Sequence, residues 1–208
     1  MNARIDHTIT SGTFSLDGGT WDVDNNVWVV GDDTECVVID APHDANAILE
    51  LVGNRKVVAI VATHAHDDHI VAAVELAEAT GAPTYLHPDD RILWDDVHEV
   101  GPDVSLADGD EIEVAGVKLQ VLHTPGHSPG ACCLYVPALG ALFSGDTLFQ
   151  GGPGATGRSF SSFETIIESI TGKLLVLPAE TVVHTGHGET TTIGEEAPHL
   201  QEWIDRGH

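Results

Sequence analysis

The sequence predicts an α/β fold, and two observations support this prediction. Residues 56–63 form an apolar run rich in β-branched side chains, which is typical of a strand buried on both faces. The segments 45–53 and 68–80, on either side of it, have helical composition, and a glycine stands at or just after the end of each. With short strands at 35–40 and 82–86, the order is β-α-β-α-β, which is that of an α/β protein.

The rest of the chain adds more strands than helices. We expect strands through most of the first 40 residues, including one at 20–30 with a possible kink at Asn25 and Asn26. Residues 111–114 and 117–123 flank Ala115-Gly116, which predicts a hairpin. The remaining expected elements are strands at 131–136, 141–143 and 181–184, a loop at 151–157, and helices at 162–170 and 195–206.

Length and composition indicate a single globular domain that spans residues 1–208. Of the 208 residues, 42% are hydrophobic and 20% are charged, which suits a packed core. There are 33 acidic and 8 basic residues, so the formal net charge is −25. A surface this negative repels phosphate backbones and anionic lipids, and we therefore expect neither nucleic acid nor a membrane as a partner. The charge serves solubility, or, with the 13 histidines, the binding of cations.

Cysteine use favours a reducing, cytoplasmic compartment. The three cysteines, Cys36, Cys132 and Cys133, have neither zinc-knuckle nor CxxC spacing, and we expect buried core thiols. The first ten residues lack the apolar stretch of a signal peptide, and no run of 18 apolar residues predicts a membrane span. The oligomeric state is left open by the sequence.

Residues 63–69, Thr-His-Ala-His-Asp-Asp-His, are the centre of the functional argument. Three imidazoles and two carboxylates lie within six residues, directly after the buried strand and before a helix. Ligand sites of α/β folds lie at this end of the strands, and polar groups buried there must be paired. An extended turn can aim His64 and His66 to one side, while Asp68 and His69 face a neighbouring point. The pattern predicts two adjacent metal positions rather than a solvated polar turn.

Three later turns supply further ligands. His127 lies in TPGHSPG, Asp146 in SGDT and His187 in TGHGE, and each turn follows a predicted strand. Glycines allow the tight turns and close backbone approach that such a site requires. Alone, each residue would be read as structural; together with the first motif, the three predict one metal centre built from strand ends.

The order HxHxDH, then a lone His, an Asp and a final His, resembles the metallo-β-lactamase fold, over about residues 64–188. The resemblance implies a four-layer αβ/βα sandwich, α/β or α+β in class, with two mixed sheets packed face to face. It also implies a ligand set and a supporting acid, Asp40. One metal would take His64, His66 and His127, the other Asp68, His69 and His187, with Asp146 bridging the two.

Within that family the sequence is most similar to the glyoxalase II-type thioester hydrolases. Flavodiiron proteins usually carry Glu at the position of His66, and many true β-lactamases lack an acid at that of Asp146. The chain lacks the C-terminal region with which glyoxalase II grips glutathione, which favours a smaller or less acidic thiol carrier. Lactonases and nucleases share much of the ligand set, and the net charge argues against a nuclease.

The implied reaction is hydrolysis of a small acyl-thiol by a hydroxide shared between two divalent metals. A ligand set without thiolates suits zinc best, and iron or manganese also. Metal binding lowers the pKa of water to about 7, and a thiolate leaves without a strong acid, so thioesters are favoured over amides. We assign catalytic roles to Asp68, which could accept a proton, and to Asp146, with Asp40 orienting a ligand.

Two alternatives to the hydrolase stay open. Persulfide dioxygenases resemble this sequence and hold one iron with two His and one Asp, here His64, His127 and Asp146. A non-catalytic binding protein on the same fold is the other, although the complete ligand set argues against it.

The loop after Asp146 is a candidate for the substrate side of the site. Residues 152–159, GPGATGRS, mimic a phosphate loop with Arg158 in place of its lysine, but no strand leads directly into them. Arg158 could bind a carboxylate or polar tail of the substrate, although an ordinary surface arginine is the simpler interpretation. Leu148, Phe149 and Phe160 could supply an apolar wall. The eight histidines outside the ligand set are interpreted as structural or surface residues.

Overall fold

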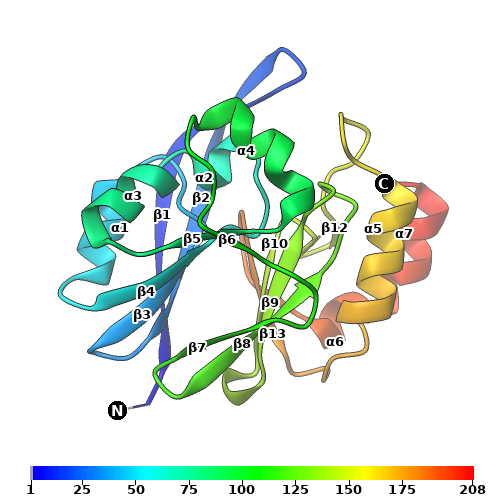
Figure 1. Cartoon of the computed structure of the whole chain (residues 1–208). Helices are drawn as coiled ribbons and strands as arrows, with labels where there is room; N and C mark the ends of the chain where they lie inside the picture. Colours follow the sequence, from blue (N-terminus) through cyan, green and yellow to red (C-terminus); the bar gives the residue numbers. More distant parts are fainter. Residues whose placement is uncertain (1) are drawn as a thin grey trace.

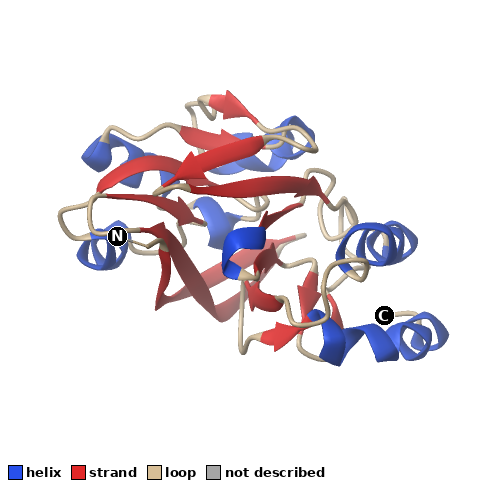
Figure 2. Cartoon of the chain, turned by 90° about the horizontal axis from the view of Figure 1, so that it is seen from below, coloured by secondary structure: helices blue, strands red, loops and turns tan. Residues whose placement is uncertain are grey.

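The computed structural model describes residues 2–208 and consists of two mixed sheets packed face to face with helices outside each. Figure 2 shows the strands in two stacked layers, with helices on the two outer sides. The four-layer sandwich that the resemblance implied is therefore confirmed.

The first sheet has six strands in the order of the chain. The strands β1 to β3 pair antiparallel, and β3 to β6 pair parallel, with helices as crossover connections. Their bounds are β1 Arg4–Leu16, β2 Gly19–Gly31, β3 Glu35–Ile39, β4 Lys56–Val61, β5 Thr84–Leu86 and β6 Val104–Ser105.

The second sheet has the order β14-β13-β10-β9-β8-β7 and is antiparallel except between β10 and β13. A separate short hairpin, β11 with β12, follows β10. The bounds are β7 Glu111–Val114, β8 Val117–His123, β9 Cys132–Val136, β10 Ala141–Gly145, β11 Leu148–Phe149, β12 Gly152–Pro153, β13 Val182–Thr185 and β14 Thr191–Thr192.

The helices divide between the two outer layers, as Figure 1 shows. Those on the first sheet are α1 Ala45–Val52, α2 Asp67–Ile70, α3 Ala73–Thr80 and α4 Arg91–Val97, with the single turn η1 Pro88–Asp90. Those on the second are α5 Phe163–Ser169, α6 Ile193–Glu196 and α7 Leu200–Arg206, with η3 Ile170–Leu174 and η4 Ala197–His199; η2 Pro137–Leu139 joins β9 to β10.

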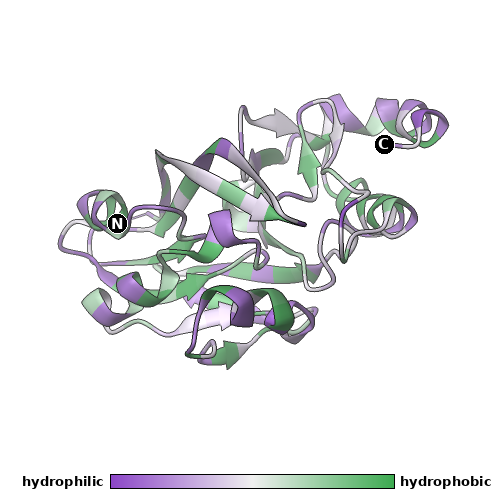
Figure 3. Cartoon of the chain, turned by 90° about the horizontal axis from the view of Figure 1, so that it is seen from above, coloured by the Kyte–Doolittle hydropathy of each residue, from purple (hydrophilic) through white to green (hydrophobic). Residues whose placement is uncertain are grey.

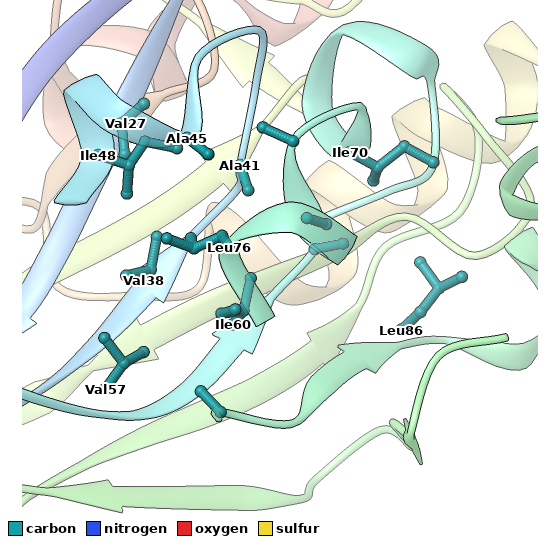
Figure 4. Packing of buried hydrophobic residues seen from close by; sticks show 14 of the residues in the cluster. Val27, Val38, Ala41, Ala45, Ile48, Val57, Ile60, Ile70, Leu76 and Leu86 are labelled. Atoms are coloured by element: carbon teal, nitrogen blue, oxygen red, sulfur yellow. The ribbon is translucent and has the colours of Figure 1, made fainter. Parts of the chain in front are cut away.

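Three apolar layers hold the sandwich together. One lies between the first sheet and its helices, where Ile48 of α1, Val38 of β3 and Leu76 of α3 meet (Figure 4). The second lies between the sheets, and the third lies under α5 and α7. In Figure 3 the central strands are largely green, while the outer helices alternate between green and purple. The hydrophobic surface removed from water in these layers is the main stabilising contribution.

The single helix expected over 68–80 is wrong, because the chain forms two helices there, α2 and α3, which are separated by Val71 and Ala72. The backbone of Ala41 takes part in the break. Its N–H donates to the carbonyl of His69 at 2.9 Å, and its carbonyl accepts from the N–H of Ala72 at 3.0 Å. These bonds take the place of helical ones and keep α2 to a single turn.

Other expected elements change in extent. The final helix over 195–206 is divided into α6, η4 and α7, since Pro198 lies in the middle and cannot continue a helix. The kink at Asn25 and Asn26 is absent, because β2 pairs with β1 through both residues without a break. The helix α4 was not among the predicted elements. None of the helices within residues 2–208 has the length and apolar character of a membrane span.

The cysteines allow a first prediction, on thiol reactivity. All three are free and buried, and burial raises the pKa of the Cys133 thiol to about 11. At pH 8 only about one thiol in a thousand would then be the reactive thiolate. We expect a chromogenic disulfide reagent to label less than one thiol per native chain at pH 8 and all three after unfolding. Rapid labelling of the native chain would contradict this burial.

Candidate metal centre

The strand ends bring the predicted ligands together at one place. His64 and His66 lie between β4 and α2, and Asp68 and His69 lie in the first turn of α2. The other three follow β8, β10 and β13 and are His127, Asp146 and His187. Three overlapping groups result, each with its ligand atoms within 4.8 Å of one another: His64, His66 and His127; His64, His69 and Asp146; Asp68, His69 and His187.

The first group is a triangle of imidazole nitrogens. Nδ1 of His66 lies 3.1 Å from Nε2 of His64 and 3.0 Å from Nε2 of His127. Zinc–nitrogen bonds of 2.0–2.1 Å in a tetrahedron would place the ligand nitrogens about 3.3 Å apart. The triangle therefore has nearly the size that one metal ion requires.

Backbone carbonyls fix the protonation of two ligand histidines. Nδ1 of His127 lies 2.8 Å from the carbonyl of Ala155, and Nδ1 of His187 lies 2.8 Å from the carbonyl of Asp24. A carbonyl can only accept, so each Nδ1 carries the hydrogen. In the neutral ring, Nε2 then presents a lone pair to the centre.

Asp40 and Thr63 fix the protonation of two more histidines of the centre, His69 and His64. Asp40 Oδ2 accepts from Nδ1 of His69 at 2.9 Å and from the Thr63 hydroxyl at 2.9 Å. Because that hydroxyl donates to Asp40, it is an acceptor for Nδ1 of His64, 3.2 Å away. Outer hydrogen bonds of this kind set the tautomer and orientation of histidines that bind metals. The lone pairs that meet at the centre repel one another unless a cation lies between them.

The group of Asp68, His69 and His187, called the second group from here on, combines a carboxylate with two imidazoles. Oδ2 of Asp68 lies 3.6 Å from Nε2 of His69 and 3.3 Å from Nε2 of His187, and the two nitrogens are 3.3 Å apart. This triangle also has edges of the length expected around one ion.

Asp146 lies between the two groups. Its Oδ2 is 3.6 Å from Nε2 of His127 and 3.4 Å from Nε2 of His187, and its Oδ1 is 3.4 Å from Nε2 of His69. Oδ1 is buried and, within the described part of the chain, has no hydrogen-bond partner. A side chain on Gly186 would collide with this carboxylate, which explains the glycine before His187. The residues present fit a pair of metal ions with one carboxylate between them.

Electrostatics differ between the two groups. Burial, followed by the neighbouring His127, lowers the pKa of His66 to about 3, and burial also lowers the pKa of His64, so these two imidazoles are neutral at physiological pH. Burial also lowers the pKa of His187, but the charge of Asp146 and hydrogen bonds to Asp146 and Asp68 outweigh it and raise that pKa to about 10. Protons thus balance the carboxylates of the second group in the metal-free chain, and a metal bound there must displace them.

Asn25 and His43 belong to this centre, although neither was among its predicted residues. Asn25 of β2 is fully buried, and its Nδ2 donates to Oδ2 of Asp68 at 3.0 Å. Nε2 of His43 lies 2.8 Å from Oδ1 of Asn25 and holds the amide in that orientation. The local signal for this role is the pair of asparagines, Asn25 and Asn26, within a strand that is otherwise largely apolar, where the sequence predicts a kink.

A cavity of about 200 Å³ opens beside the centre. Its apolar wall is Phe14 and Leu16 of β1 with Val23 of β2, and five of its other lining residues are ligand candidates: His66, Asp68, His127, Asp146 and His187. The wall expected from Leu148, Phe149 and Phe160 differs from the observed one, because none of the three lines the cavity. Leu148 is buried in the layer under α5, and Phe160 is 48% exposed. Phe149 lies beside the centre, with its ring centroid 6.3 Å from that of His187.

Arg158 lies at the cavity as one of its lining residues. Its Cζ is 4.0 Å from the ring centre of Trp21 and 5.2 Å from that of Phe14. Stacking on these rings fixes the guanidinium without using its hydrogen-bond donors. The predicted phosphate-loop mimic is a hairpin and irregular loop rather than a strand–loop–helix unit.

One further group of possible ligands lies apart from the centre, and its geometry does not suit a metal. The rings of His87 and His123 are stacked with centroids 3.9 Å apart and planes 12° apart, next to the exposed Asp89. A nitrogen lone pair lies in its ring plane, so two nearly parallel rings cannot aim at one ion. Both histidines fit the structural role expected from the sequence.

Comparisons with known proteins assign the chain to a family. The model of the metallo-β-lactamase superfamily matches residues 20–187. An uncharacterized protein of Aquifex aeolicus is 40% identical over 81% of this chain and 86% of its own. The hydroxyacylglutathione hydrolase GloC of Haemophilus influenzae is 33% identical over 79% of this chain and 85% of its own. The probable metallo-hydrolase YqgX of Bacillus subtilis is 36% identical over 77% and 83%.

Solved structures resemble the chain over nearly its whole length. BLEG-1, a B3 metallo-β-lactamase, superposes with a TM-score of 0.80 at 31% identity, over 92% of this chain and 98% of its own. TTHA1623, solved in a di-iron-bound form, superposes with a TM-score of 0.75 at 34% identity, over 90% and 96%.

Proposed function

The chain belongs to the metallo-β-lactamase superfamily, and we propose that it is a binuclear metallohydrolase that cleaves the thioester of a small thiol carrier. One observation carries the hydrolase proposal: Asp146 lies between the two groups of ligand candidates, within 3.6 Å of His127 in one and 3.4 Å of His187 in the other, and both groups open onto one cavity. We favour zinc; the di-iron form of TTHA1623 makes iron the main alternative.

The roles of the residues follow from their positions. Metal ions held by the two groups would supply a hydroxide nucleophile at neutral pH and stabilise charge on a carbonyl oxygen. His64, His66 and His127 would hold one ion, and Asp68, His69 and His187 the other. Asp146 would bridge them, and Asp40 would keep the His69 ring oriented through its Nδ1. Asp68, which lines the cavity, is the side chain we assign to accept a proton.

The cavity favours a thioester over an amide. Both carboxylates among its described lining residues, Asp68 and Asp146, are assigned as metal ligands, and proton transfer by Asp68 competes with its ligation, so the cavity offers no spare acid for a leaving nitrogen. A thiolate needs no such acid, because an ordinary thiol has a pKa of about 8.5. The apolar wall of Phe14, Leu16 and Val23 suits a short acyl chain or the methylenes of a thiol carrier.

Specificity for the thiol carrier gives a second prediction. We propose that Arg158 binds an anionic or polar tail of the substrate from its place beside the cavity. Arg158→Gln is expected to raise KM for a carboxylated thioester about tenfold, because it removes a hydrogen bond to a charge. It should leave kcat, and both constants for an uncharged thioester of the same acyl group, within about twofold. An equal loss on both substrates would contradict the assignment.

Matched substrates test the function. A thioester, an oxygen ester, a lactone and an amide, with the same acyl group where chemistry permits, are assayed with the metal-loaded protein. We expect thioester turnover to exceed amide turnover by at least about a hundredfold. If the lactone is hydrolysed fastest, the proposed substrate class would be a lactone and not a thioester. Oxygen uptake with a persulfide, without thioester hydrolysis, would establish the dioxygenase instead.

A further inference from the structure

Asp90 is a buried carboxylate that is absent from the ligand groups. It is the last residue of η1 and lies directly before α4. Its exposed fraction is 0%. Burying a carboxylate costs free energy unless it is fully hydrogen-bonded, so its partners show what this position does.

Those partners come from the two loops that carry the first group of ligands. Oδ2 of Asp90 accepts from the N–H of Ala65 at 2.9 Å and from the hydroxyl of Ser128 at 2.7 Å. Oδ1 accepts from the N–H of Gly130. The carboxylate therefore ties the loop after β4 to the loop after β8 by three hydrogen bonds.

The bonded groups are next to the ligands in the chain. Ala65 stands between His64 and His66, and Ser128 follows His127. The loop after β8 lies directly against Asp90, because a side chain on Gly130 would lie 2.6 Å from the backbone nitrogen of Asp90. The geometry of the triangle thus depends on a carboxylate that touches none of its three nitrogens.

We propose that Asp90 is a positioning residue that sets the affinity of the first metal position, the one formed by His64, His66 and His127. The inference rests on the metal centre of the proposed function and is independent of the substrate. A carboxylate satisfies all three donors at once. An asparagine has one acceptor oxygen, so its NH2 group would face either the N–H of Gly130 or the two donors of Ala65 and Ser128.

Glu196 provides a matched control. It is also a buried carboxylate, 3% exposed, and accepts from the N–H of Gly151 at 3.0 Å and the hydroxyl of Thr191 at 2.6 Å. Neither of these partners stands next to a ligand candidate in the chain. Glu196→Gln therefore imposes a similar loss of buried hydrogen bonds without disturbing the two ligand loops.

The experiment measures Co²⁺ affinity by competition with a chelator, in a His187→Ala background that leaves the first position as the complete one. Asp90→Asn is expected to weaken Co²⁺ binding by 10–100-fold and to shift the visible absorption of the bound ion, which reports ligand geometry. Ser128→Ala should weaken it by a smaller factor and serves if Asp90→Asn fails to fold. Glu196→Gln should stay within about twofold of the background.

The outcomes separate this inference from the function. Equal Co²⁺ affinities for Asp90→Asn, Ser128→Ala and Glu196→Gln would overturn the role of Asp90 and leave the metal centre intact. A background protein that binds no Co²⁺, together with a parent chain that binds none, would overturn the metal centre itself. Selective weakening in Asp90→Asn or Ser128→Ala, with an altered spectrum, would establish the positioning role.

Discussion

His66→Ala is expected to purify with about one metal per chain instead of two and to lose at least a thousandfold in kcat. The change removes Nδ1 of His66, the nitrogen that lies within 3.1 Å of both other nitrogens of the first group. A position with two imidazoles binds zinc poorly, and a thousandfold loss corresponds to about 4 kcal/mol of activation free energy. Metal content and thioester turnover are measured on the same preparation.

A histidine outside the centre provides the control for this variant. His98 is half-buried, and its Nε2 bonds to the carbonyl of Ile70. His98→Ala should keep both metals and kcat within about threefold. Full activity and two metals in His66→Ala would show that this ligand assignment is wrong.

Asp146→Asn should have an effect at both positions. The asparagine keeps the shape of the side chain but removes the negative charge that lies between His127 and His187. We expect the metal content to fall at both positions and kcat to fall at least a thousandfold, since the bridge between the ions is lost. Metal analysis and steady-state kinetics check this expectation.

The same variant makes a signed pH prediction. The charge of Asp146 is the largest of the effects that raise the pKa of His187 to about 10. In metal-free Asp146→Asn, the pKa of His187 should therefore be lower than in the parent, as followed by NMR titration. Asp103→Asn is a control, because Asp103 accepts from Thr84 at β5 and is not a ligand candidate. An unchanged His187 titration in Asp146→Asn would contradict the electrostatics described here.

The sequence predicted the parts of the centre that depend on local order along the chain. A buried strand that ends in a histidine-rich turn, and later turns that follow other strands, place their side chains at strand ends, where α/β folds carry their ligand sites. The strand at 56–63 and the hairpin around Ala115-Gly116 were predictable for the same reason, since their periodicity and turn residues are local.

Other parts depend on tertiary contacts that have no local signature. Asn25 faces Asp68 only because β2 crosses the end of α2, and Asp90 bonds two loops that are distant in sequence. The wall of the cavity comes from the first hairpin, which is held over the centre by a bond from the N–H of Ser15 to Asp67. A single apolar residue such as Phe14 carries no local signal that it will line a cavity beside residues distant in the sequence.

The central claim is that two metal ions share Asp146 in one site. Plasma mass spectrometry on protein purified without added metal tests it most directly. The account predicts about two metal atoms per chain, of zinc or of a zinc, iron and manganese mixture, and about one in His66→Ala. Close to one atom per parent chain, nearly all of it iron, would contradict the binuclear hydrolase and favour the mononuclear dioxygenase.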